Sequence, residues 1–160
     1  MSDRLAAQVQ LEWDQLHRLL DRHRRLLNAC TLREPDDIEI SALAAVLHSL
    51  YNGIENILKR IAIESGDPPL NREYWHKYLL DAMAQATDKR TAVISRELRA
   101  QLLEYMEFRH VFRHAYVFDL RWAKMDHLVL HCEEVLHRLE NEVNQFMAAR
   151  KRSSSNEPNE

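Results

Sequence analysis

Residues 36–61 have the sequence DDIEISALAAVLHSLYNGIENILKRI, and this stretch decides the fold class. Its apolar side chains recur every three or four residues, which is the spacing of one face of an α-helix and not of a strand. These positions are Leu43, Leu47, Leu50, Ile54, Ile57 and Ile61. Asp36 is followed three residues later by Glu39, the spacing of a capping box that opens a helix. The stretch therefore predicts a long amphipathic helix that begins at Asp36.

The same periodicity extends over most of the chain and predicts an all-α protein of about five helices. The other four predicted helices cover about residues 3–28, 71–84, 95–114 and 120–149. Asn71, Ser95 and Asp119 are the predicted N-caps of the last three. Residues 150–160 are rich in Ser, Asn and Glu, so we expect a disordered tail after a single helical domain of residues 1–149.

The composition excludes several classes of protein. The 160 residues include only two glycines, Gly53 and Gly66, so neither a dinucleotide-binding fingerprint nor a P-loop can form. A net charge of −3 argues against a protein that coats nucleic acid through bulk electrostatics. No apolar run approaches the roughly 20 residues of a membrane span, and residues 1–5 lack the order of a secretory signal. Cys30 and Cys132 lie outside any Cys-x-x-Cys motif, as expected for reduced thiols in the cytoplasm.

Charged residues interrupt the apolar face of the fourth predicted helix. At about 100° per residue, the face that carries Leu98 and Leu102 continues to Arg109, Arg113 and Tyr116. An uncompensated charge on an inward face costs several kcal/mol, so these arginines need ion-pair partners or a ligand. A salt-bridged helix terminus is the simpler interpretation, and a binding or catalytic site is the alternative.

Two histidines, His110 and His114, accompany these arginines. Arg109 and His114 point roughly 140° apart on an ideal helix, so they meet only at a helix end or where two chains face each other. A second apolar surface on the same helix indicates either a central position in the bundle or a homodimer contact. It consists of Phe108, Val111, Phe112 and Ala115. Together the cluster offers a general acid or base and cationic groups for a phosphate.

Residues 109–116, RHVFRHAY, have the form Arg-x4-His-x-Tyr. This pattern resembles the active-site motif of HepT-like toxins, which belong to the HEPN superfamily of small all-helical ribonucleases. The segments 47–61, 74–76 and 93–95 are also similar to that group, so the resemblance covers about residues 10–147.

The resemblance implies a metal-independent endoribonuclease without a cofactor, whose active site forms between two protomers. Arg109 would bind the scissile phosphate, and His114 would transfer protons, as base toward the 2′-hydroxyl or as acid toward the leaving 5′-oxygen. The implied products are a 2′,3′-cyclic phosphate and a free 5′-hydroxyl. His110 replaces the asparagine common in the family but still donates a hydrogen bond.

Tyr116 matches the tyrosine that MNT-type nucleotidyltransferase antitoxins modify with AMP. The implied role is therefore the toxin of a type VII-like HEPN/MNT toxin–antitoxin pair. Its RNA substrate and the acid or base role of His114 stay open at this point. An adenylyl group beside the arginines would add negative charge and oppose RNA phosphate binding.

A polar line, His48, Asn52 and Glu55, follows the face of residues 36–61 opposite the apolar stripe. One interpretation is a solvated helix face. The other is that Glu55 pairs with Arg109 or Arg113 and orients it.

Two functions compete with the nuclease interpretation. Glu-x-x-His occurs at Glu73/His76, Glu107/His110 and Glu134/His137, the spacing used by di-iron bundles. Glu134 and His137 are expected to point outward, away from Leu128 and Cys132, which argues against metal. The other competitor is a catalytically inactive HEPN-type module that only binds a nucleotidyltransferase.

Overall fold

The computed structural model describes residues 2–68 and 73–155, and within these ranges every regular element is a helix. The α-helices are α1 (Asp3–Arg22), α2 (Arg24–Ala29), α3 (Asp37–Glu64), α4 (Trp75–Met83), α5 (Arg96–His114) and α6 (Asp126–Ser155). Two short 3₁₀ helices, η1 (Val117–Asp119) and η2 (Trp122–Lys124), join α5 to α6. The all-α prediction is confirmed.

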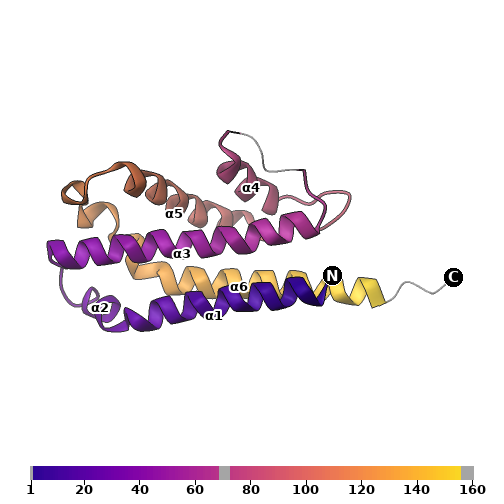
Figure 1. Cartoon of the computed structure of the whole chain (residues 1–160), viewed down its shortest axis with the longest axis horizontal. Helices are drawn as coiled ribbons and strands as arrows, with labels where there is room; N and C mark the ends of the chain where they lie inside the picture. Colours follow the sequence, from indigo (N-terminus) through magenta and orange to yellow (C-terminus); the bar gives the residue numbers. More distant parts are fainter. Residues whose placement is uncertain (1, 69–72, 156–160) are drawn as a thin grey trace.

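The long helices form a bundle with α3 at its centre. Helices α1 and α6 lie along one side of α3, while α5 and the short α4 cover the other side (Figure 1). The apolar stripe that defined residues 36–61 is buried, with Leu43, Leu50, Ile54, Ile57 and Ile61 fully inaccessible. Burial of such side chains stabilises the fold by about 1.5–3 kcal/mol each. Helix α3 therefore packs against α1 and α6 on one side and against α4 and α5 on the other.

The predicted caps of α3 and α5 are confirmed. Asp36 accepts a hydrogen bond from the Glu39 amide at 2.8 Å, and the Glu39 carboxylate accepts one from the Asp36 amide at 3.0 Å. Ser95 Oγ accepts from the Leu98 amide at 3.2 Å, and Glu142 of α6 holds this serine from the other side. The start of α5 is thus attached to α6. Asn71, the cap predicted for residues 71–84, lies outside the described residues.

Three predicted helix boundaries are wrong. The helix expected over residues 3–28 is broken at His23, whose Nδ1 lies 2.8 Å from the Leu19 carbonyl oxygen at the end of α1. Asp119 ends η1 and caps no long helix, because the chain makes two 3₁₀ turns before α6 begins at Asp126. At the other end, α6 continues through residues 150–155, which the sequence placed in a disordered tail. Residues 156–160 lie outside the described part.

Helices α1 and α3 approach closely at Gly53. A Cβ at this position would lie 2.5 Å from Leu16 Cδ2. Leu16 and the neighbouring Trp13 are both buried. Glycine is therefore favoured here by helix packing and not by a special backbone conformation, because a larger residue would displace Leu16.

Candidate active site

Arg109 is a buried cation, as its position on the apolar face of α5 predicted. Only 6% of the residue is exposed, and its guanidinium faces α3. Nη1 donates to Asn52 Oδ1 at 2.8 Å and to Glu55 Oε1 at 3.0 Å, and Nη2 donates to Glu55 Oε2 at 3.2 Å. The guanidinium also lies over the Tyr51 ring, 5.1 Å from its centroid. Arg109 is therefore held by a two-point carboxylate contact, an amide and an aromatic ring.

Glu55 is the anion that compensates this charge. It is 7% exposed, so the interpretation of residues 48–55 as a solvated face is wrong for Glu55. The physical reason is that α5 covers this side of α3. The structure contains the pairing of Glu55 with Arg109 and not with Arg113. Because both charges are buried, removal of either one leaves the other uncompensated.

His76 of α4 completes the network. Its Nδ1 lies 2.6 Å from Glu55 Oε2 and 2.9 Å from Arg109 Nη2. Its ring lies 3.8 Å from that of Trp75, centroid to centroid. Tyr74, which precedes α4, has φ 62° and so adopts the left-handed conformation that a bulky residue rarely uses. This turn sets the direction in which α4 presents His76 to α3.

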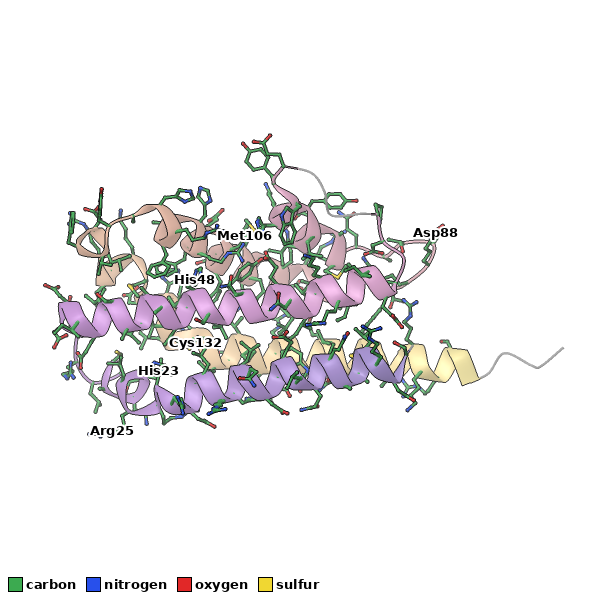
Figure 2. The ribbon with its side chains drawn as sticks, viewed as in Figure 1. His23, Arg25, His48, Asp88, Met106 and Cys132 are labelled. Atoms are coloured by element: carbon green, nitrogen blue, oxygen red, sulfur yellow. The ribbon has the colours of Figure 1, made fainter. Side chains whose placement is uncertain are left out.

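His48 extends the network along α3 toward the end of α5. The ring contacts Phe112 of α5 at 5.2 Å between centroids, and His48 lies on the α5 side of α3 (Figure 2). Its Nε2 lies 3.1 Å from Asn52 Nδ2, the amide whose oxygen accepts from Arg109. Burial first, and then the charges of Arg109 and Arg113, lower the pKa of His48 below its ordinary value. The ring is therefore neutral, and the Asn52 amide donates to it.

The last turn of α5 presents a second group of polar side chains to solvent. His110, Arg113 and His114 are all exposed. The two imidazoles lie 4.6 Å apart between centroids, and His114 Nδ1 lies 2.8 Å from the His110 carbonyl oxygen. The Arg113 guanidinium makes no hydrogen bond or ion pair with any residue in the described ranges.

Tyr116 does not lie on the inward face, which corrects the helical extrapolation. Helix α5 ends at His114, and Ala115 is extended with ψ 151°, so Tyr116 leaves the helix. Its side chain is 71% exposed and is stacked on Phe118 with 5.2 Å between the ring centroids. Arg113 also differs from its predicted inward position, because most of the last turn of α5 is exposed.

Arg109 and His114 are not brought together within one chain. Arg109 points into the bundle and His114 points to solvent, as the roughly 140° between them predicted. The other predicted supporting residues, His48 and Glu55, lie with Arg109, whereas His110 and Arg113 lie with His114. The site thus has a buried half and an exposed half.

Sequence reasoning assigned no role in the site to His76 or Asn52. Asn52 stood in the polar line of residues 48–55, and His76 appeared only in the Glu-x-x-His pattern with Glu73. The useful signal was the position of His76 directly after Tyr74 and Trp75, in a segment similar to the HepT-like group. Its partner, Glu55, is 21 residues away, and only the tertiary structure could identify it.

Metal ligands do not assemble at the Glu-x-x-His pairs. His76 contacts Glu55 instead of Glu73, and the side chain of Glu134 is 78% exposed, as expected for an outward position. Across residues 2–68 and 73–155, groups of three or more His, Cys, Asp or Glu side chains able to hold a metal ion are absent. In the same ranges, none of the helices has the length and apolar character needed to cross a membrane.

A comparison with protein families matches residues 42–150 to the family described as HepT-like protein. The match contains α4, α5 and most of α3, the three helices that hold the Glu55, His76 and Arg109 network. The chain belongs to the HepT-like family. This HepT-like chain is thus a member of the HEPN group that the motif at residues 109–116 suggested. No curated protein and no solved structure matches it.

Proposed function

We propose that this HepT-like protein is the ribonuclease toxin of a type VII-like toxin–antitoxin pair and acts in the cytoplasm. It is a metal-independent endoribonuclease that functions as a homodimer. The observation that carries the proposal is the arrangement of residues 109–114 of α5. One arginine is buried and fixed by Glu55, while His110, Arg113 and His114 project to solvent directly beyond it.

The division of the site into two halves supports a composite active site. In one chain Arg109 and His114 face different directions, so a second copy is needed to supply the missing group. Exposed apolar side chains adjoin the motif: Val111 is 55% exposed, Val117 58% and Phe118 82%. A two-fold contact through this region brings the ends of two α5 helices together, because each copy uses the same surface.

The residues have the chemistry that RNA cleavage by the 2′-hydroxyl requires. Arg113 has no protein partner among the described residues, so its five N–H donors are available for phosphate oxygens. The Arg109 guanidinium lies behind this surface, where Glu55 and Asn52 hold it in place, and its proposed role is to contact the scissile phosphate. His114 transfers a proton through Nε2, since its Nδ1 faces the His110 carbonyl. The products are a 2′,3′-cyclic phosphate and a 5′-hydroxyl.

Tyr116 is proposed as the site at which an MNT-type nucleotidyltransferase antitoxin attaches AMP. Its hydroxyl belongs to a side chain that is 71% exposed and lies two residues from His114. An adenylyl phosphate at this position would place negative charge three residues from Arg113 in the sequence. Modified protein would therefore bind RNA phosphates less tightly.

Cleavage of a synthetic oligoribonucleotide in excess EDTA tests the proposal. We expect wild-type protein to cleave RNA but not an all-2′-deoxy oligonucleotide, and to leave 2′,3′-cyclic phosphate ends. Arg113→Ala and His114→Ala should each lower kcat/KM by about 10²-fold or more, in the range of lost acid–base or phosphate contacts. Both side chains are exposed, so these variants should fold normally.

His131→Ala is the matched control, since His131 is an exposed histidine of α6 that contacts Glu134. It should retain full activity. Expression of the wild-type protein alone should arrest growth, and His114→Ala should relieve the arrest. EDTA-sensitive cleavage, or cleavage that His114→Ala leaves unchanged, would contradict the proposal.

A catalytically inactive module is the second candidate function. The specific observation in its favour is that Glu55 and Asn52 already occupy donors of both Nη atoms of Arg109. Such a module would bind an MNT-type nucleotidyltransferase without cleaving RNA. Absence of growth arrest together with stable binding of the nucleotidyltransferase would favour this function.

A further inference from the structure

His76 occupies a position that the Arg-x4-His motif does not include. It comes from α4, Glu55 from α3 and Arg109 from α5, and their polar atoms lie within 3.2 Å of one another. The imidazole is therefore part of the same network as the motif arginine. The side chain is 33% exposed, whereas Glu55 and Arg109 are buried.

Two contacts of His76 Nδ1 favour opposite tautomers: Glu55 Oε2, which only accepts hydrogen bonds, lies 2.6 Å away, and Arg109 Nη2, which only donates, lies 2.9 Å away. The shorter contact with the carboxylate favours the ring hydrogen on Nδ1, and Arg109 Nη2 then donates to Glu55 instead. Nε2 of the neutral ring then carries a lone pair. Nε2 has no hydrogen-bond partner in the described ranges. It is not a buried atom, so it is accessible to solvent. His76 thus presents a proton acceptor outward.

The ring of His76 is held in one orientation. Trp75 lies against it, and the Lys59 ammonium lies 5.0 Å from the Trp75 ring centroid. Glu55 cannot rotate away without losing its two contacts with Arg109. A carboxylate behind an imidazole fixes the tautomer and stabilises the imidazolium that forms when the ring takes up a proton.

Cleavage of RNA through the 2′-hydroxyl needs two proton transfers. One proton leaves the 2′-hydroxyl as its oxygen forms a bond to phosphorus. Another proton reaches the 5′-oxygen as the bond between phosphorus and that oxygen breaks. One imidazole cannot carry out both transfers in a single concerted step, so a second acid–base group is required.

We propose that His76 is the general base of this reaction and that His114, from the second protomer, is the general acid. The inference rests on the proposed ribonuclease function. His76 has the carboxylate that stabilises its protonated form after it accepts the 2′-hydroxyl proton. His114 lies in the last turn of α5 and is exposed, so its Nε2 can reach the leaving 5′-oxygen. After each turnover, proton exchange with water restores both rings.

Glu55 on α3 and Arg109 on α5 place one negative and one positive charge against His76, and the Lys59 ammonium lies 5.0 Å from the centroid of the neighbouring Trp75 ring. Glu73 and Lys77 flank it in sequence and are exposed. The base assignment predicts that cleavage falls on the acid side of the pH–rate profile as His76 becomes protonated.

Two full-length variants and two substrates test the inference. The first substrate is an oligoribonucleotide with a natural 5′-oxygen leaving group. The second has a 5′-bridging sulfur, which leaves without protonation. His76→Gln should lower kcat by about 10²–10⁴-fold on both substrates, because loss of a base is not relieved by a better leaving group. His114→Ala should lower kcat on the natural substrate, and the kcat of this variant should return toward that of wild type on the sulfur substrate.

His17→Gln is the matched control, because His17 Nε2 lies 2.9 Å from Glu140 and so also belongs to a histidine–glutamate pair. It should leave kcat unchanged. His76→Ala supplies a second measurement: added imidazole should restore part of its activity, which a structural role for His76 does not explain. The acid limb of the pH–rate profile should also disappear in His76→Gln.

The outcomes separate the two proposals. If His76→Gln keeps kcat within about twofold of wild type while His114→Ala is inactive, the inference is wrong and the ribonuclease proposal stands. If the sulfur substrate rescues His76→Gln, the base assignment is wrong. If wild-type protein cleaves neither substrate, the ribonuclease proposal fails, and the role of His76 fails with it.

Discussion

Arg109 and Glu55 bury a full positive and a full negative charge between α5 and α3. Their side chains are 7% and 9% exposed, and two contacts of 3.0 and 3.2 Å join the guanidinium to the carboxylate. The attraction between such charges is offset by the loss of their hydration, so the pair adds little net stability. Removal of one partner of the pair destabilises the protein, because the other charge is then left unpaired in the interior.

A double-mutant cycle measures this coupling. We expect Arg109→Leu and Glu55→Leu to lower the free energy of unfolding by about 3–5 kcal/mol each. The double variant should be less destabilised than the sum, by about 1–3 kcal/mol, because neither charge is then left alone. Urea denaturation gives the four values. The control pair is Arg24 and Glu133, 42% and 48% exposed, with an expected coupling below about 1 kcal/mol. Additive single effects at Arg109 and Glu55 would contradict the prediction.

His48 makes the stability depend on pH. Burial and the two arginines lower its pKa below the ordinary 6.5, so the unfolded chain binds this proton more readily than the folded chain. The contribution is fully present above pH 6.5 and is lost as the pH falls through the lowered pKa. The free energy of unfolding of wild type, relative to His48→Gln, should therefore be larger at pH 8 than at pH 5. His131→Gln serves as the exposed control, and an identical pH dependence in His48→Gln and wild type would contradict the assignment.

At the scale of elements, the contact of α1 with α3 depends on the absence of a side chain at Gly53. Leu16 occupies the space that a Cβ on Gly53 would need. Gly53→Val improves the intrinsic helix propensity but forces the two helices apart or moves Leu16 from its position.

We expect Gly53→Val to lower the free energy of unfolding by about 1–3 kcal/mol, the usual effect of overpacking. Ala45→Val, at an exposed position of α3, introduces the same side chain without the clash and should change stability by about 0.5 kcal/mol or less. Thermal or urea denaturation compares the two variants. An equal effect at both positions would mean that the approach of α1 to α3 is looser than the 2.5 Å distance implies.

At the scale of the whole molecule, the proposed dimer uses one end of the bundle. The turn after α5 carries Tyr116, Val117 and Phe118, all more than half exposed. Ile63 lies at the C-terminal end of α3 and is 67% exposed. This end of α3 is at the other end of the bundle from the turn after α5 (Figure 1). These two exposed apolar sites allow a matched comparison.

We expect the double substitution Val117→Glu and Phe118→Glu to convert the dimer into monomers, because it places charges in the apolar contact. Light scattering coupled to size exclusion measures the mass. The same variant should lose RNA cleavage. Its unfolding midpoint should equal that of the dissociated wild-type monomer, because both positions are exposed in the single chain. Ile63→Glu should leave mass and activity unchanged. A monomeric wild-type protein with full activity would exclude a composite site.

The sequence by itself determined the fold class, the caps at Asp36 and Ser95, and the motif of the HepT-like family. These features depend on local periodicity and on hydrogen bonds between residues three apart, which a linear pattern contains. The prediction from sequence was wrong between Ala115 and Met125, where two 3₁₀ helices replace the expected start of a long helix. Helical extrapolation carries no information once the chain leaves the helix.

Only the tertiary structure decided which partners Arg109 has. Glu55 is 54 residues from Arg109 and His76 is 33 residues away, so their meeting depends on how α3, α4 and α5 rotate and pack. Periodicity defines the faces of each helix but not which faces meet, because that choice is made by the close packing of the whole core. For the same reason, the sequence could not show that Glu55, in the polar line of α3, is buried in an ion pair with Arg109 and does not face solvent.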